Sequence, residues 1–246
     1  MLKKIIITGG TGRFGNVLKK VKNNYNISFP KKNEFNILDY KNLKSYINKV
    51  KPKIIIHLAG LSRPMKIHEK EISKSIDLNI IGTCNITKVC SEKNIKLIYF
   101  STNYVYPGTK GNYSEKDGLL PVNNYAWSKL GGEAAVHLYK NSLILRVCMT
   151  EKPFVHKAAF ANVKNNFIYQ EQVAEVLFKL LDQKGVINVG GKSQYIYDFV
   201  KKDKKDVKKI YLKKNLNVGV PFDSSMNIMK LKKIKKNYDK SKRKKI

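Results

Sequence analysis

The sequence is poor in cysteine and histidine. Its 246 residues contain three cysteines, Cys84, Cys90 and Cys148, an odd number with no C-x-x-C spacing. This usage suits a reducing compartment and argues against both a disulfide framework and a zinc site. The four histidines show no ligand spacing either. We therefore expect structural histidines and no bound metal.

Long apolar runs are also absent. Nothing approaches the roughly 18 consecutive apolar residues of a membrane-spanning helix. The apolar part of Met1–Thr8 is too short for a signal peptide and leads directly into glycine-rich sequence. We interpret this segment as the first strand of a mature cytoplasmic protein and expect no membrane association.

Acidic residues and arginine are scarce beside lysine. The net charge is +31, and among 49 basic residues only Arg13, Arg63, Arg146 and Arg243 are arginines. A basic surface is the usual electrostatic mark of nucleic-acid binding, but bidentate recognition of bases and phosphates favours arginine. Asn and Ile, which an AT-biased genome also over-uses, are abundant. We interpret the excess as coding bias and solvated lysine, which argues against a nucleic-acid partner.

A glycine-rich segment follows the first predicted strand. Lys3–Thr8 is β-branched, Gly9–Gly15 reads Gly-Gly-Thr-Gly-Arg-Phe-Gly, and a helical pattern continues through Val17, Leu18 and Val21. Strand, glycine turn and helix form the context in which such glycines bind a dinucleotide pyrophosphate. The helix start supplies N–H groups to the phosphate charge.

Strands and helices then alternate as far as residue 148. Apolar strands are expected at 25–29, 54–60, 97–100 and 143–146, with helices between them. The continuous apolar run at 54–60 is typical of a strand buried on both faces of a parallel sheet. The pattern predicts an α/β, Rossmann-type, doubly wound parallel sheet over residues 1–148.

The pattern changes after Arg146. A helix is expected at 171–181, a short strand at 186–189 and a turn at 221–223. We assign residues 149–236 to a small C-terminal substrate-binding lobe, interleaved with the first domain. Residues 237–246 are dominated by lysine and predict a disordered basic tail.

Tyr125 and Lys129 are spaced for one face of a helix. Side chains four residues apart on a helix point the same way, and a nearby cation stabilises a phenolate. Tyr125 is therefore a candidate proton donor and acceptor for a carbonyl/alcohol pair. The hydroxyl of Thr102, at the end of the strand at 97–100, could hold the same oxygen. Taken alone, a tyrosine and a lysine at this spacing are more often an ordinary surface pair. The glycine turn at the start of the chain makes a catalytic pair the better interpretation.

The end of the second predicted strand favours NADP(H), with NAD(H) left open. NAD-preferring folds place an acidic residue there for the ribose hydroxyls. This chain has Ser28 followed by Lys31 and Lys32, whose charges would attract a 2′-phosphate.

Together, three motifs resemble the extended short-chain dehydrogenase/reductase family, in particular its branch of dTDP-4-dehydrorhamnose reductase and related sugar-nucleotide reductases. They are Thr8–Gly15, Ser101–Tyr106 and Tyr125–Glu133, in that order. The resemblance runs from Lys3 to about Arg146, with weaker similarity to about Leu231.

The resemblance implies catalytic roles for Thr102, Tyr125 and Lys129. It also implies a cofactor-binding set around the pyrophosphate, adenine, ribose and nicotinamide: Gly9, Gly12, Arg13, Phe14, Gly15, Asn36, Ile37, Leu58, Ala59, Asn79 and Lys129. The implied activity is NAD(P)H-dependent reduction of a nucleotide-activated keto-deoxysugar.

Two departures from the branch affect this interpretation. Asn103 stands where an aspartate usually follows the catalytic threonine, and the chain after Arg146 is shorter than usual. Two alternatives stay open: an NAD-dependent sugar-nucleotide epimerase or dehydratase, and a non-catalytic, cofactor-binding regulatory subunit. A homodimer also stays open.

Overall fold

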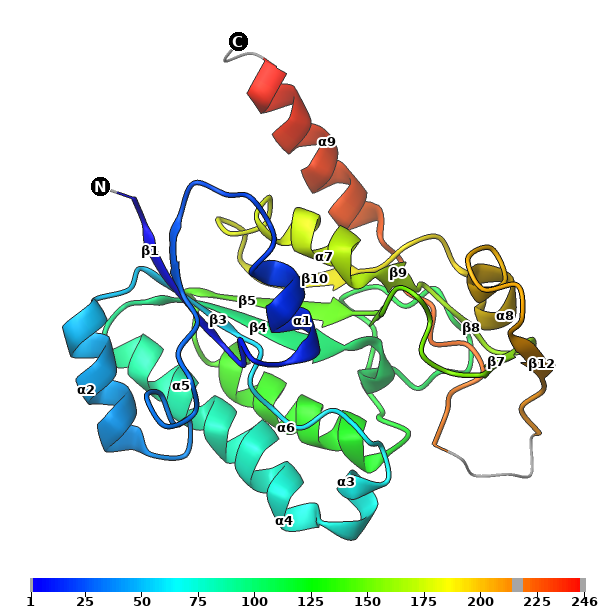
Figure 1. Cartoon of the computed structure of the whole chain (residues 1–246), viewed down its shortest axis with the longest axis horizontal. Helices are drawn as coiled ribbons and strands as arrows, with labels where there is room; N and C mark the ends of the chain where they lie inside the picture. The colour runs from blue at the N-terminus through cyan, green and yellow to red at the C-terminus, as the bar shows by residue number, and fades with distance from the viewer. Residues whose placement is uncertain (1, 214–218, 244–246) are drawn as a thin grey trace. The chain divides into compact units, whose positions relative to one another are not determined.

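The computed structural model describes residues 2–213 and 219–243 (Figure 1). The chain divides into two compact units, which are described separately. The first comprises residues 1–101, 124–145 and 181–186; the second comprises residues 102–123, 146–180 and 187–246. The chain enters the second unit at Thr102, and again at Arg146 and Ile187.

A six-stranded sheet is the centre of the fold, and its strand order is β10-β5-β4-β3-β1-β2. Pairing is parallel between β1 and β2, β1 and β3, and β3 and β4. The predicted doubly wound parallel sheet is confirmed. Its strands are β1 (Lys4–Thr8), β2 (Asn26–Ser28), β3 (Ile54–His57), β4 (Lys96–Thr102), β5 (Ser142–Val147) and β10 (Gly185–Val189).

The strand order reverses at β1, which pairs with β2 on one side and β3 on the other. In open α/β sheets, ligands bind beyond the carboxyl ends of the strands at this switch point. The carboxyl ends of β1 and β3 carry Thr8 and His57, paired in register. The glycine turn therefore begins where the topology predicts a ligand.

Helices cover both faces of the strands in the first unit. Helices α2, α5 and α6 lie on one face, and α1 lies on the other (Figure 1). The helices of this unit are α1 (Arg13–Leu18), α2 (Tyr40–Val50), α3 (Ile67–Lys70), α4 (Ile72–Ser75), the π-helix η1 (Ile76–Ile81), α5 (Gly82–Glu92) and α6 (Asn124–His137).

The apolar spacing predicted the long helices because it repeats with the helical period. Leu43 and Ile47 of α2 are buried against Ile86 and Val89 of α5 in one core cluster. The Asp39 side chain accepts a hydrogen bond from the Asn42 N–H and caps α2. Burying such an aliphatic side chain contributes about 1.5–3 kcal/mol, so this cluster fixes the helices on the sheet.

The second unit contains short strands, which pair as β6 with β9, β7 with β12 and β8 with β11. Their bounds are β6 (Met149–Thr150), β7 (Ala158–Phe160), β8 (Lys164–Asn165), β9 (Ile168–Tyr169), β11 (Gln194–Tyr195) and β12 (Lys208–Ile210). The helices are η2 (Asn103–Val105), α7 (Gln170–Leu177), α8 (Ile196–Val200) and α9 (Met229–Arg243).

The strand predicted at 186–189 is β10, which lies beside β5 in the central sheet. One sequence-based assignment differs from the structure. Residues 237–243, expected in a disordered tail, continue helix α9. Asp239 of this helix pairs with Lys179 at 2.7 Å, and the Lys179 ammonium lies over the Tyr238 ring. Residues 244–246 lie outside the described residues.

A buried polar network organises the second unit. The Tyr106 hydroxyl accepts a hydrogen bond from Arg146 Nη1 at 2.8 Å and lies 2.8 Å from Asn188 Oδ1. Asn188 Nδ2 donates to the carbonyls of Tyr113 and Asn227. The partners of the Asn188 amide are far from it in the sequence. This one buried side chain therefore connects segments of the second unit that are distant along the chain.

Replacing Asn188 by leucine is expected to destabilise the protein by about 2–4 kcal/mol, because several buried polar groups lose their partners. Asn188 is fully buried. Thermal unfolding measures the effect. The matched control is Asn48→Leu on the exposed side of α2, expected to change stability by less than about 0.5 kcal/mol. Equal stability of the two variants would contradict the role given to Asn188.

Candidate active site

The glycine turn after β1 has the close packing that the sequence predicted. Gly9 adopts φ +69°, and the Gly12 N–H donates to the Gly9 carbonyl at 2.9 Å. A Cβ at Gly9 would lie 2.7 Å from the backbone nitrogen of Ala59, and one at Gly15 would lie 2.6 Å from the Gly10 Cα. The missing side chains let the turn lie against β3 and let α1 lie against the turn. This is the arrangement that a pyrophosphate site requires.

Thr8 joins this turn to the end of β3. Its hydroxyl accepts hydrogen bonds from the N–H groups of Leu58 (3.1 Å) and Ala59 (3.0 Å) and lies 2.8 Å from His57 Nδ1. The Leu58–Ala59 backbone is thereby held beside Gly9. Leu58 and Ala59 lie at the switch point, where the sequence predicted them, with side chains that are half-buried.

His57 is a neutral structural residue in this network. The Thr83 hydroxyl donates to the Asn79 carbonyl, so it accepts from His57 Nε2 at 3.1 Å. Nδ1 then carries no proton and accepts from Thr8. Burial, and secondarily the charge of Lys129, lower the pKa of His57 to about 3. The expectation of a structural role fits this geometry.

Asn79 braces the loop that follows β3. Its Oδ1 accepts from the Leu61 N–H at 2.7 Å, and its Nδ2 donates to the Leu61 carbonyl and to Ser128 Oγ at 2.9 and 2.8 Å. Ser128 in turn donates to the Tyr125 carbonyl at 2.8 Å. The Asn79 amide thus links the loop to helix α6, so we assign it to shaping the site.

Tyr125 and Lys129 lie in α6, one turn apart, as predicted. Lys129 is 9% exposed, and its ammonium lies 4.2 Å from the centroid of the Tyr99 ring. Burial lowers the pKa of Lys129 to about 7, and the charge of Glu133 acts in the opposite direction. A buried lysine one turn from a tyrosine is unlike an ordinary surface pair.

The first turn of α6 is held by the short helix α3. The ring of His68 packs on that of Tyr125, with centroids 5.2 Å apart. Asn124 Nδ2 donates to the Glu69 carboxylate at 2.5 Å. These contacts fix the start of the helix that carries Tyr125, and neither His68 nor Glu69 was predicted to matter.

The remaining predicted cofactor residues have mixed environments. Arg13 is exposed and donates to Ser62 Oγ at 3.3 Å, whereas Phe14 is buried with its ring 5.3 Å from that of Phe100. Asn36 Oδ1 accepts from the Leu38 N–H, and Ile37 is buried. Phe14 and Ile37 therefore contribute packing, and Arg13 is the exposed cation of the set.

Thr102 ends β4 and belongs to the second unit, whereas Tyr125 and Lys129 belong to the first. Thr102 is 6% exposed, and its hydroxyl accepts from the Tyr104 N–H at 3.3 Å. The next residue, Asn103, donates through Nδ2 to Ser224 Oγ at 2.8 Å. An ionised aspartate could not donate this bond, which gives a physical reason for the asparagine.

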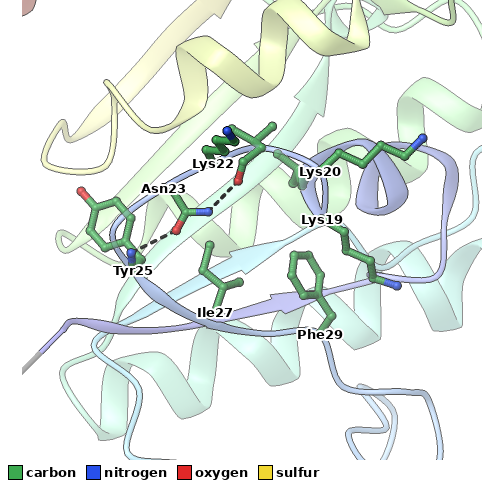
Figure 2. Close-up of a pocket in the computed structure, with 9 residues that line it drawn as sticks. Lys19, Lys20, Lys22, Asn23, Tyr25, Ile27 and Phe29 are labelled. Atoms are coloured by element: carbon green, nitrogen blue, oxygen red, sulfur yellow. Dashed lines mark hydrogen bonds between the residues drawn. The ribbon is translucent and has the colours of Figure 1, made fainter.

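A pocket lies at the end of α1, apart from the predicted site residues. Its volume is about 420 Å³, and Figure 2 shows lysine side chains and the rings of Tyr25 and Phe29 around it. Asn23 donates to the Val21 carbonyl and accepts from the Tyr25 N–H, which holds the turn (Figure 2). The Lys19 ammonium lies 5.5 Å from the Phe29 ring centroid. No motif in the sequence indicates this pocket.

The part of the chain that the structure describes has neither a metal-binding cluster nor a membrane-spanning helix. There, His, Cys, Asp and Glu side chains form no group of three that could hold a metal ion. Across residues 2–213 and 219–243, every helix is too short or too polar to span a bilayer.

A family model described as "RmlD substrate binding domain" matches residues 3–186. This match covers the glycine turn, β4 and helix α6. The chain belongs to this family. The resemblance stated from the three motifs is confirmed at the level of the family.

Proteins similar in sequence to this chain carry names that indicate different functions. Methionine adenosyltransferase 2 subunit beta of Xenopus tropicalis is 34% identical over 155 residues, covering 59% of this chain and 46% of that protein. The dTDP-D-glucose 4,6-dehydratase of Dictyostelium discoideum is 28% identical over 277 residues, covering 95% of this chain and 62% of that protein. The chain thus spans about half to two thirds of the length of these two relatives.

Solved structures share the fold. The dTDP-4-dehydrorhamnose reductase of Bacillus anthracis, solved with NADP, superposes with a TM-score of 0.84 at 23% identity, over 94% of this chain and 92% of that one. The similarity in fold covers both units, whereas the three motifs reach only residues 102–106 of the second.

Proposed function

We propose that the chain is an NAD(P)H-dependent reductase that acts on the keto group of a nucleotide-activated deoxysugar, as in dTDP-4-dehydrorhamnose reductase. The observation that carries the proposal is the buried Lys129, one helical turn after Tyr125 and close to the ring of Tyr99. Membership of the RmlD substrate binding domain family and the NADP-bound structure of similar fold support it.

The first unit fits a dinucleotide at the glycine turn. Without a Cβ, Gly9 packs against the backbone of Ala59, and Gly15 packs against that of Gly10. Gly12 is extended and precedes α1, and Arg13 offers an exposed charge. Bound NAD(P)H would supply hydride to the carbonyl carbon. Leu58 and Ala59, held by Thr8, would border its ribose and nicotinamide side.

The chain's own residues handle the proton. Tyr125 donates its phenolic proton to the developing alkoxide, and we assign to Thr102, by the family resemblance, a second hydrogen bond to that oxygen. Lys129 in its charged form favours the phenolate that remains. Placing Thr102 in this role remains a proposal, tested by the loss of turnover in Thr102→Val.

The proposed cofactor is NADP(H), with NAD(H) as the alternative. Lys31 and Lys32 are exposed just after β2. The Glu34 carboxylate accepts the Lys31 N–H at 2.7 Å, so one acidic group is also close to this turn.

Replacing both Lys31 and Lys32 by glutamate is expected to raise KM for NADPH about tenfold or more, because the new carboxylates repel a 2′-phosphate. KM for NADH should change less than about twofold. Steady-state rates with each cofactor measure this. The control is the double replacement of Lys19 and Lys20 by glutamate in the pocket at the end of α1, which makes the same charge change. Parallel loss of NADPH affinity in both variants would contradict a specific role for Lys31 and Lys32.

An epimerase or dehydratase is the second candidate, favoured by the dehydratase relative that covers 95% of this chain. Such enzymes retain their cofactor and need no added reductant. Nicotinamide absorbance in the purified protein without NADPH consumption would support this candidate over the reductase.

A non-catalytic, cofactor-binding subunit is the third candidate. It is favoured by the relative named as subunit beta of methionine adenosyltransferase 2, at 34% identity. Fold does not dictate function, and residues that could act in catalysis can persist without turnover. Binding of NADPH with no turnover on any keto-sugar substrate would support this candidate.

An assay with a panel of nucleotide-linked 4-keto sugars and both reduced cofactors tests the proposal, followed by identification of the product. Consumption of NADPH with a reduced sugar as product is expected. Cytoplasmic location and a homodimer stay predictions, and retention on DNA that falls with salt would revive the nucleic-acid interpretation.

A further inference from the structure

Helix α6 carries a third ionisable side chain in line with Tyr125 and Lys129. Tyr125, Lys129 and Glu133 are spaced four residues apart, so their side chains share one side of the helix. Glu133 has no solvent exposure, and Lys129 is 9% exposed. Burying an ionised carboxylate destabilises the folded state unless an opposite charge or hydrogen bonds compensate for the lost solvation. The burial of Glu133 therefore requires an explanation.

The two carboxylate oxygens of Glu133 have different partners. Ser101 Oγ donates to Oε2 at 2.5 Å, and His137 Nε2 lies 3.5 Å from Oε1. A hydrogen bond donated to a carboxylate favours its ionised form. His137 has a half-exposed side chain. Both contacts favour the ionised form of Glu133 over the neutral one.

Other titratable groups around Lys129 come from the neighbouring strands and helix. Tyr99 of β4 lies under the ammonium, and burial raises its pKa well above the ordinary value, so it is neutral. His57 of β3 is neutral because burial lowers its pKa to about 3. Cys84 of α5 lies close enough to act on Tyr99. With Tyr99 and His57 neutral, Glu133 is the group of this set available to balance the charge of Lys129.

We propose that Glu133 is the counter-charge that keeps Lys129 protonated, and that it thereby sets the upper pH limit of proton donation by Tyr125. The second half of this inference rests on the proposed reductase function; the first half does not. Glu133 is a positioning residue in this scheme: it acts on the proton donor through Lys129.

The direction of the effect follows from burial. Burial lowers the pKa of Lys129 to about 7, and Glu133 acts against this shift. Without the carboxylate, Lys129 would lose its proton at a lower pH. The phenolate would then lose its neighbouring cation under conditions where the wild-type protein retains it.

The direct test is a ¹³C NMR titration of lysine Cε in the wild-type protein and in Glu133→Gln, which keeps an acceptor for Ser101. The Lys129 signal is assigned by its loss in Lys129→Met. The titration midpoint of Lys129 is expected to fall by roughly one pH unit or more. The control is Glu92→Gln, which removes an exposed carboxylate from α5. An unchanged midpoint in Glu133→Gln would overturn the proposal.

A reciprocal measurement keeps the proposal testable if Glu133→Gln does not fold. In Lys129→Met, the titration midpoint of the Glu133 carboxyl is expected to rise relative to wild type, because coupling between two charges acts equally on both. An unchanged Glu133 midpoint in Lys129→Met would also overturn the proposal.

The pH dependence of kcat separates this inference from the proposed function. In Glu133→Gln, the loss of activity on the alkaline side should begin at lower pH, a change that a merely structural role would not produce. If the Lys129 midpoint shifts in Glu133→Gln but the wild-type protein has no reductase activity, the proposed function is wrong and the charge pairing stands. If the wild-type protein is an active reductase and the Lys129 midpoint does not shift, the charge pairing is wrong and the proposed function stands.

Discussion

Tyr125→Phe is expected to reduce turnover of a keto-sugar substrate by about 10²–10⁴-fold, with NADPH affinity changed by less than about twofold. The phenolic oxygen is the proposed proton donor, so its removal affects the reaction and not the pyrophosphate contacts. The ring that packs on His68, with centroids 5.2 Å apart in the wild-type structure, is retained by phenylalanine. The fold should therefore persist. NADPH oxidation and fluorescence titration of NADPH measure the two quantities.

The matched control is Tyr195→Phe, which removes a phenol from a side chain that is 46% exposed in the second unit. Its turnover should equal that of the wild-type protein. If Tyr125→Phe also retained full turnover, Tyr125 would not be the proton donor, and the cofactor-binding subunit would become the better description.

Gly9→Ala is expected to destabilise the protein by about 3 kcal/mol, lowering Tm by about 6–12 °C, and to weaken NADPH binding at least tenfold. The residue has φ +69°, and its Cβ would lie 2.7 Å from the backbone nitrogen of Ala59. These are backbone atoms of the segment that follows β3 and cannot rotate away, so the turn must move. The same turn is the proposed pyrophosphate site, which links stability and affinity. Thermal unfolding and fluorescence titration measure the two effects.

Two other glycines distinguish the effect of backbone strain from that of the close contact at Gly9. Gly185 has φ +79° but no atom within 4 Å of a built Cβ, so Gly185→Ala should cost about 1–2 kcal/mol from backbone strain alone. Gly118 has neither constraint, and its replacement by alanine should be nearly neutral. Neither variant should affect NADPH affinity. Normal affinity in a folded Gly9→Ala protein would contradict the placement of the pyrophosphate.

The fold of the first unit could be predicted because its signals are local. The apolar run at Ile54–His57 is buried at every position in β3, as a strand covered on both faces requires. The four-residue spacing of Tyr125 and Lys129 survives as one face of α6. Glycines after β1 were informative because close backbone approach permits no other residue.

The elements that the sequence did not reveal depend on distant partners. Strand β10 belongs to the central sheet because it pairs beside β5, and nothing within its five residues specifies that neighbour. Asn103 meets Ser224 across 121 residues of chain. The lysine-rich end forms α9, where Lys179 pairs with Asp239; a lysine run read alone predicts solvated chain.

The sequence predicted which side chains form the site, but not the hydrogen bonds and packing contacts that connect them. Motif spacing identified Lys129, but its burial and its approach to Tyr99 depend on tertiary packing. Glu133 was part of the matching motif with no role attached to it. The bracing contacts of Asn79 could not be inferred, since a polar side chain on a helix has no preferred partner until the fold is known.

Transfer of deuterium from [4-²H]NADPH, stereospecifically labelled, to a nucleotide-linked 4-keto sugar tests the central claim most directly. The account predicts one deuterium at the former carbonyl carbon of the product, with the rate of transfer reduced by about 10²–10⁴-fold in Tyr125→Phe. A wild-type protein that binds NADPH but transfers no deuterium to any keto sugar of the panel would contradict it.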